Sequence, residues 1–333
     1  MLRPLGKTGV EVSRIALGAM SFGGDADEHT AYGIYRAARD AGINFIDTAD
    51  VYNEGRSEEF LGRFVKGERD DLVIATKAYF PTGPGANSRG ASRYHLVRAV
   101  EASLHRLQTD RVDLFYLHRF DDATDLGETL RAVDDLVRAG KILYPACSNY
   151  AAWQVAHALG EQARAGMAPF VAVQPMYNLV KRTAEIELLP MAHALGVAVV
   201  PYSPTGGGLL TGKYGAATKP ERGRLLDTKM YAVRYGDPAN FEIAERFCAL
   251  AAELGMAPAT LAVAWAASHP AVTSVLVGGR DAAQLAPTLA ALTVELDAAT
   301  RARISALSPE PPPATDRNEE TSAHSYSATL ARR

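Results

Sequence analysis

The sequence predicts an α/β fold, a closed (β/α)8 TIM barrel, from two observations. Short apolar runs bounded by polar residues alternate with stretches of helical length, as buried parallel strands alternate with helices. The runs number eight, which is the number of strands that closes such a barrel. A length of 333 residues is compatible with one domain or two, so the alternation decides. The expected strands end near Leu17, Ile46, Thr76, Leu117, Cys147, Val173, Val200 and Val277.

A β-hairpin is expected ahead of the first barrel strand. Two apolar segments between Leu2 and Val12 flank a turn that contains glycine. Such a hairpin can close one end of a barrel.

The stretches between most strands have the periodicity of amphipathic helices. In residues 92–107, for example, Leu96, Val100, Leu104 and Leu107 recur at three- and four-residue spacing. The expected helices span residues 28–41, 57–66, 92–107, 126–139, 151–165, 184–195, 240–254 and 281–292.

The alternation breaks after the seventh strand, where residues 201–272 form a long loop. It contains three consecutive glycines from Gly206, a charged segment at 219–224 and two helical patterns. Long inserts on a barrel usually bind ligands. The barrel is expected to span residues 1–308. The tail, 309–333, begins with prolines and stays polar, so we expect it to be disordered or to cover the barrel mouth.

The composition is that of a globular protein and argues against several classes of function. Apolar residues make up 47% of the chain and charged residues 22%, while the net charge of −3 and scattered Lys and Arg disfavour nucleic-acid binding. Only Cys147 and Cys248 occur, without CxxC spacing, and the histidines form no HxH or HExxH pair, so no metal site is expected. No secretion signal or bilayer-spanning stretch is evident, which predicts a cytoplasmic protein without a membrane partner. Nothing indicates an oligomeric state.

Four polar residues follow the expected strands closely. Asp47, Lys77 and His118 each come directly after an apolar run, and Tyr52 lies in the loop after Asp47. The carboxyl ends of barrel strands surround one cavity, so these side chains are expected to meet there.

These four residue types can deliver a proton to a carbonyl oxygen. Tyrosine, with a pKa near ~10, is a poor acid at neutral pH unless a cation lowers that value. We expect Lys77 to bond the Tyr52 hydroxyl, Asp47 to hold Lys77, and His118 to orient a carbonyl or relay a proton. Hydride addition to a carbonyl needs such an acid because charge builds on oxygen. Each residue alone has a structural alternative, such as an Asp47–Lys77 ion pair or a satisfied interior histidine.

Several motifs, in order, resemble the long-chain branch of the aldo-keto reductases, the branch that includes potassium-channel β-subunits. The resemblance runs from Leu5 to about Leu292. The motifs are FIDTADVY at 45–52 with Gly55, Ser57 and Glu58 after it, IATK at 74–77, LHRFD at 117–121, SNY at 148–150, QPMYN at 174–178 and YSP at 202–204.

The resemblance implies hydride transfer from NADPH to an aldehyde or ketone without a metal. Tyr52 would be the proton donor, with Asp47, Lys77 and His118 completing the tetrad. The nicotinamide would be held by residues after the later strands: Ser148, Asn149 and Gln174 on its carboxamide, and Tyr202 on its ring, with Ser203 and Pro204 beside it.

The resemblance also implies where the phosphates lie. The segment 208–213, with Leu209, Gly212 and Lys213, is similar to the family's loop over the pyrophosphate. After the last strand, Gly278 leads to a helix start that can bind phosphate, Arg280 can pair with the 2′-phosphate of NADP, and Gln284 resembles an adenosine contact. Relatives often have Asn at the position of Thr288, which weakens one adenine contact, and residues 143–147 also depart from the family pattern.

Two further functions are kept as alternatives: an NADPH-binding, redox-sensing regulatory subunit and a pathway-specific keto-sugar reductase. The expected partner is a small carbonyl compound. The aromatic residues that could line an apolar pocket are Phe22, Tyr79, Phe80, Phe120 and Tyr231. The arginines near the mouth that could meet an anionic substrate are Arg89, Arg93 and Arg119.

Overall fold

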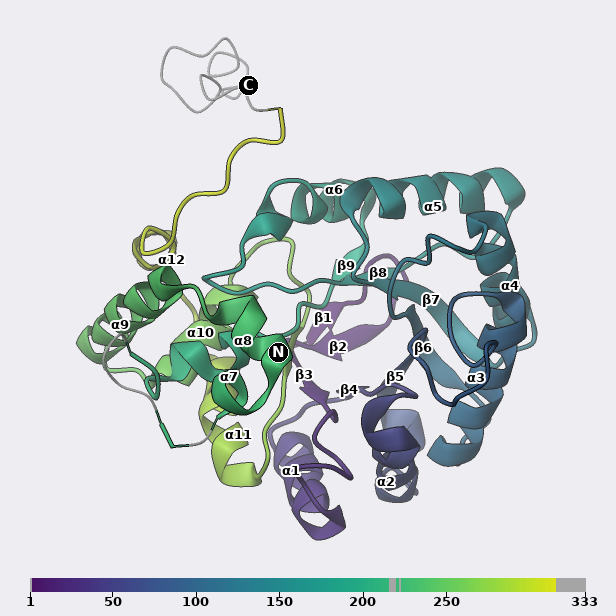
Figure 1. Cartoon of the computed structure of the whole chain (residues 1–333), viewed down its shortest axis with the longest axis horizontal. Helices are drawn as coiled ribbons and strands as arrows, with labels where there is room; N and C mark the ends of the chain where they lie inside the picture. Colours follow the sequence, from purple (N-terminus) through teal and green to yellow (C-terminus); the bar gives the residue numbers. More distant parts are fainter. Residues whose placement is uncertain (1, 216–219, 222, 316–333) are drawn as a thin grey trace.

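Eight parallel strands form the centre of the molecule in a computed structural model that describes residues 2–215, 220–221 and 223–315. Neighbouring strands pair in the order β10-β3-β4-β5-β6-β7-β8-β9 (Figure 1). All eight expected strands are confirmed. Their bounds are β3 Ile15–Gly18, β4 Phe45–Asp47, β5 Val73–Ala78, β6 Val112–Leu117, β7 Ile142–Ser148, β8 Ala172–Gln174, β9 Ala198–Val199 and β10 Val275–Val277.

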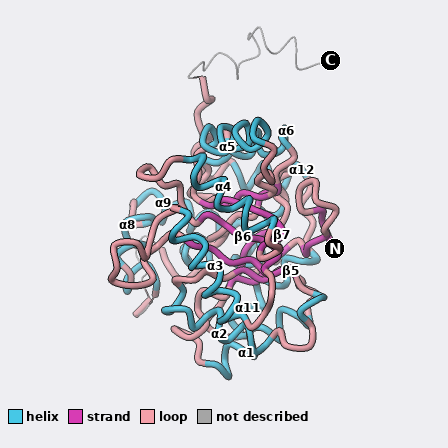
Figure 2. Tube along the Cα trace, turned by 90° about the vertical axis from the view of Figure 1, so that its right-hand side faces the viewer, coloured by secondary structure: helices cyan, strands magenta, loops and turns pink. Residues whose placement is uncertain are grey.

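The two outer strands of this order are joined, which closes the barrel. The amide of Thr273 donates to the carbonyl of Val199 at 2.8 Å, and the amide of Leu276 donates to the carbonyl of Pro201 at 2.9 Å. Helices surround the strands on the outside (Figure 2). The predicted (β/α)8 architecture is therefore confirmed.

The expected hairpin is also confirmed, as β1 (Leu2–Pro4) paired antiparallel with β2 (Glu11–Ser13). Leu5 and Val12 belong to the buried cluster inside the barrel, together with inward-facing residues such as Phe45 and Leu114. A Cβ on Gly6 would lie 2.9 Å from the carbonyl oxygen of Val171, just before β8. The hairpin therefore fills the barrel end at which the strands begin.

The expected helices are present, with ends that differ by a few residues. The segment after β9 contains more helices than expected, because short helices in a charged segment show no clear apolar period. A further helix, α12, follows α11 near the end of the described chain. The helices are α1 Glu28–Asp40, α2 Arg56–Phe64, α3 Arg93–Leu107, α4 Leu126–Arg138, α5 Ala152–Ala165, α6 Leu188–Leu195, α7 Arg224–Asp227, α8 Lys229–Tyr235, α9 Pro238–Glu253, α10 Pro258–Ala267, α11 Ala282–Leu289 and α12 Ala298–Ser305.

Two ends of the chain take part in closing the barrel. The Arg3 guanidinium donates to the carbonyl of Val272 at 2.6 Å, and that of Arg14 donates to the carbonyl of Val294 at 2.9 Å.

The tail expected at 309–333 lies outside the described residues from 316 onward. Within the described ranges no single helix has the length and apolar composition to cross a membrane; α9 and α10 pass that test only as a pair, bent by 97°.

Helices α2 and α3 approach so closely at Gly62 that no side chain fits there. A Cβ would lie 2.5 Å from the carbonyl oxygen of Arg106 and 2.7 Å from the carbonyl carbon of Leu107. We expect Gly62→Ala to lower the free energy of unfolding by about 1–3 kcal/mol, because backbone atoms must move. Gly33→Ala in α1 is the control, since nothing lies within 4 Å of its added Cβ and alanine favours a helix. Urea unfolding that ranks the two variants equally would contradict this packing.

Candidate active site

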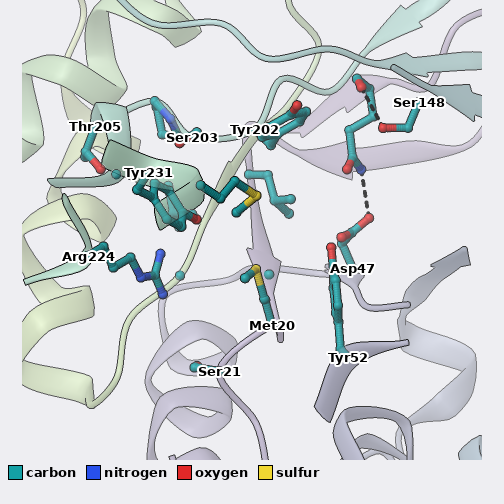
Figure 3. A pocket seen from close by; sticks show the side chains of 18 of the residues that line it. Met20, Ser21, Asp47, Tyr52, Ser148, Tyr202, Ser203, Thr205, Arg224 and Tyr231 are labelled. Atoms are coloured by element: carbon teal, nitrogen blue, oxygen red, sulfur yellow. Dashed lines mark hydrogen bonds between the residues drawn. The ribbon is translucent and has the colours of Figure 1, made fainter. Parts of the chain in front are cut away.

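A cavity of about 530 Å³ opens where the strands end. It is the site that the sequence indicated, since most of the expected residues line it (Figure 3). These are Asp47, Tyr52, His118, Ser148, Asn149, Gln174, Tyr202, Ser203, Pro204 and Gly278. Six expected residues do not line it: Lys77, Leu209, Gly212, Lys213, Arg280 and Gln284.

Lys77 lies one layer beneath the cavity, in a fully buried ion pair with Asp47. Its ammonium donates to Asp47 Oδ1 and, at 2.7 Å, to the carbonyl of Thr48. Gln174 Nε2 donates to the other Asp47 oxygen at 2.8 Å. Burial raises the pKa of Asp47 and lowers the pKa of Lys77, and their mutual attraction opposes both changes. The expected pairing of Asp47 with Lys77 is confirmed.

Tyr52 begins the turn η1 (Tyr52–Gly55) and sits over this pair. The expected hydrogen bond from its hydroxyl to Lys77 is wrong, because the ammonium bonds Asp47 and Thr48 and lies 5.2 Å from the Tyr52 ring centroid. The expected lowering of the Tyr52 pKa is also wrong: burial raises it, and the charge of Asp47 raises it further. Tyr52 therefore holds its proton at neutral pH.

The turn after Tyr52 is held in an uncommon conformation. Asn53, Glu54 and Gly55 have φ of 50°, 60° and 89°, which is the left-handed region. The Asn53 amide secures the turn by donating to the carbonyls of Met20 at 2.9 Å and Phe22 at 2.7 Å. Strained backbone of this kind persists where surrounding bonds fix it, which here sets the position of Tyr52.

His118 faces the cavity as a neutral imidazole. Burial, and then the charge of Lys77, lower the pKa of His118 to about 3. The Phe80 ring lies 4.8 Å away, and His118 Nδ1 is buried without a hydrogen-bond partner among the described residues. A neutral imidazole carries one N–H, so it can donate to a carbonyl oxygen but is not a charged acid at neutral pH.

The residues expected around the nicotinamide bond one another across β7, β8 and β9. Ser148 Oγ donates to the carbonyl of Gln174 at 2.9 Å, and Asn149 Nδ2 donates to the carbonyl of His118 at 2.9 Å. The Tyr202 hydroxyl donates to Asn149 Oδ1 at 2.8 Å. This last bond fixes the Tyr202 ring at the cavity wall, and Asn149 itself has a left-handed φ of 57°.

Two of the residues expected around the phosphates, Lys213 and Arg280, form a cationic cluster with Arg224, which lines the cavity. Burial lowers the pKa of Lys213, and the positive charges of Arg280 and then Arg224 lower it further. Three cations that repel one another are stable when an anion lies between them. Two other residues have different surroundings: Leu209 is fully buried, and Gln284 Oε1 accepts from the Arg280 amide at 2.8 Å.

A second buried network, centred on Glu58, bonds the residue before Lys77. Glu58, which is fully buried, accepts from Thr76 Oγ1 and from Arg106 Nε, the latter at 2.7 Å. Thr76 precedes Lys77 in β5, so this network anchors the strand that carries the lysine. Asp50 lies close by, 2% exposed, and neither of its carboxylate oxygens has a partner in the described part of the chain.

Asp50 makes the stability of the protein depend on pH. Burial, and then the charge of Glu58, raise the pKa of Asp50 to about 8, so the native state holds a proton that the unfolded chain releases near pH 4. The free energy of unfolding should therefore fall as the pH rises from about 4 to 8, and we expect Asp50→Asn to remove this fall, on the order of several kcal/mol. Urea unfolding at pH 5 and pH 9 measures it. The control is the exposed Asp122→Asn, and an unchanged pH slope in Asp50→Asn would contradict the assignment.

Comparison with known proteins identifies the family. The model of the aldo/keto reductase family matches residues 14–309. The chain belongs to the aldo/keto reductase family. It is 39% identical over 305 residues to the uncharacterized oxidoreductase YrpG of Bacillus subtilis, covering 88% of this chain and 91% of that protein. It is 36% identical over 302 residues to a probable voltage-gated potassium channel subunit beta of Arabidopsis thaliana, covering 87% and 90% of the two chains. A protein of the same description from Oryza sativa is 35% identical.

This aldo/keto reductase chain is thus an oxidoreductase of a family that typically uses NAD(P)H. Its residues fit such a dinucleotide: an anchored aromatic ring and amide groups lie at one part of the cavity, and cations with few anionic neighbours lie beside another. Aromatic and amide groups suit a nicotinamide, and clustered cations suit its phosphates.

Sequence reasoning missed part of the cavity wall. Met20 and Ser21, after β3, and Arg224 and Arg234, from α7 and α8, line the cavity. Short helices and a strand-end serine leave little signal in a single sequence.

Several wall residues were also assigned wrongly. Of the aromatic residues expected at the pocket, Phe80 and Tyr231 line it, whereas Phe22 packs on Phe64 and Phe120 on Tyr150. Of the expected arginines only Arg119 lines it, because Arg93 pairs with Asp135.

Proposed function

We propose that this protein uses NADPH to reduce an aldehyde or ketone to an alcohol, with Tyr52 as the general acid. The observation that carries the proposal is the position of Tyr52, which lies at the cavity wall directly over the buried Lys77–Asp47 pair, with His118 beside it. The ring centroids of Tyr52 and His118 are 6.0 Å apart. Two hydrogen-bond donors therefore face one region of the cavity, where a carbonyl oxygen can accept from both.

Each side chain has a distinct part in this proposal. NADPH supplies a hydride when it is bound. The neutral His118 donates a hydrogen bond that orients the carbonyl oxygen, and Tyr52 gives its proton to that oxygen as negative charge builds there. Lys77 stabilises the resulting phenolate charge, and Asp47 holds Lys77 in place. Gln174, which bonds Asp47, keeps that carboxylate in a single orientation.

We propose NADP rather than NAD as the cofactor because of the cationic cluster. Arg280 is exposed beside Lys213 and can pair with a 2′-phosphate that NAD lacks. Thr288 lines the cavity but donates its hydroxyl to the carbonyl of Leu285 at 2.7 Å, which leaves this side chain without a free donor for an adenine. The proposed preference for NADP over NAD therefore rests on the positive charge of the cluster and not on an adenine contact.

A second candidate function is an NADPH-binding regulatory subunit. The similarity to two proteins described as probable potassium channel subunits beta favours it. The complete tetrad favours catalysis, since a binding subunit needs the cofactor wall but not a proton donor. We therefore rank the reductase first.

Nicotinamide absorbance during incubation with a panel of aldehydes and ketones tests the proposal. We expect oxidation of NADPH, with kcat/KM for NADPH at least tenfold above that for NADH, and loss of this preference in Arg280→Met. Bound NADPH that no carbonyl oxidises would overturn the reductase and favour the regulatory subunit. Equal use of both cofactors by the wild type would overturn the choice of NADP but not the proposed reductase activity.

A further inference from the structure

One wall of the cavity carries more positive charge than a neutral carbonyl compound needs. The charged residues that line the cavity are Asp47, Arg119, Arg224 and Arg234. Asp47 is neutralised by Lys77, whereas none of the three arginines forms an ion pair with a carboxylate in the described ranges. Arginines that lack a protein partner at a cavity wall are suited to an anion from a ligand.

Arg224 and Arg234 border the same ring, Tyr231, but influence the pKa of different groups. The positive charge of Arg224 lowers the pKa of Lys213, so Arg224 belongs to the cationic cluster that suits cofactor phosphates. Arg234 instead influences Tyr202: burial raises the pKa of Tyr202, and the positive charge of Arg234 lowers it. Tyr202 is the anchored ring expected at the nicotinamide, and Arg234 lines the same cavity as Tyr202 and Tyr52.

Tyr231 connects Arg234 to the proton donor. The guanidinium carbons of Arg224 and Arg234 each lie 5.7 Å from the Tyr231 ring centroid. Tyr231 lies across the cavity from Asp47 and Tyr52 (Figure 3). A ligand that spans the cavity can therefore contact Tyr52 at one wall and Arg234, beside Tyr231, at the other.

We propose that the substrate is a carbonyl compound that carries a carboxylate or phosphate group, and that Arg234 binds this group while Tyr231 holds the guanidinium in place. The proposal rests on the proposed reductase function and names its substrate class. A guanidinium stacked on an aromatic ring keeps its N–H groups directed at an anion, since the ring restricts its rotation. Arg119, two residues after β6, is a further cation in the cavity lining.

A matched pair of aldehydes tests the charge alone. The carboxylate 4-carboxybenzaldehyde and its methyl ester share one ring and one carbonyl, so the ratio of their kcat/KM values reports recognition of the anion. We expect the full-length protein to favour the carboxylate at least tenfold and Arg234→Met to lower this ratio more than tenfold. The control is Arg98→Met, which removes an arginine stacked on Tyr94 at the surface of α3, and we expect an unchanged ratio.

Two further measurements separate the possible failures. NADPH affinity, from nicotinamide fluorescence, should change less than threefold in Arg234→Met; a larger loss would assign Arg234 to the cofactor and overturn the proposal. Quenching of that fluorescence by terephthalate reads anion binding without turnover. Ester turnover without a preference for the carboxylate would overturn the anion site alone. Selective terephthalate binding without any turnover would support the anion site and overturn the reductase.

Discussion

Replacing Tyr52 with phenylalanine should lower kcat for carbonyl reduction by about 10²- to 10⁴-fold, the usual contribution of a general acid. The loss arises because no other side chain at the cavity wall offers a proton in the same position; His118 is neutral, and Lys77 is occupied beneath the wall. Folding should be unaffected, since the Tyr52 hydroxyl forms no hydrogen bond with the part of the chain that the structure describes.

NADPH affinity and urea unfolding are the companion measurements for Tyr52→Phe, and both should match the wild type. Tyr150→Phe is the matched control. Tyr150 is also a buried tyrosine whose pKa burial raises, but it packs on Phe120 and Phe170 away from the cavity. If Tyr52→Phe retained full kcat, the assigned proton donor would be wrong, whatever its effect on binding.

Replacing Lys77 with methionine should abolish turnover and also lower the free energy of unfolding by about 3–5 kcal/mol. Methionine has a similar length but leaves Asp47 buried without its cation, with Gln174 as the remaining side-chain donor. The destabilisation should shrink at low pH, because a protonated Asp47 needs no cation. Urea unfolding at pH 5 and pH 8 measures both effects.

The double variant Asp47→Asn, Lys77→Met separates stability from catalysis. With the buried charge removed, most of the lost stability should return, while turnover should remain absent. A double variant no more stable than Lys77→Met would show that the charge of Asp47 is not the cause. Restored turnover would remove Lys77 from the mechanism.

The order of elements and most of the site followed from the sequence because their signals are local. Asp47, Lys77 and His118 each lie at or near the end of an apolar strand, and parallel strands end on one side of a barrel. The positions of Asp47, Lys77 and His118 in the chain therefore determined where they lie in space.

The environment of those residues did not follow from the sequence. The tyrosine pKa was expected to fall because a lysine lies near it, but burial and then the charge of Asp47 raise it. Which acceptor an ammonium bonds depends on distances of an ångström, which spacing in a sequence does not contain. The same holds for Arg234, whose place at the cavity depends on how α8 packs after a long loop.

The closure of the barrel joins residues that are translated at opposite ends of synthesis. β3 pairs with β10, Arg3 bonds the carbonyl of Val272, and Arg14 bonds the carbonyl of Val294. A ribosome that has released the first strand must therefore add most of the remaining chain before that strand gains its second neighbour. Contacts so distant in sequence slow folding. Until then the nascent chain has an unpaired edge at β3, and unpaired strand edges favour association with other chains.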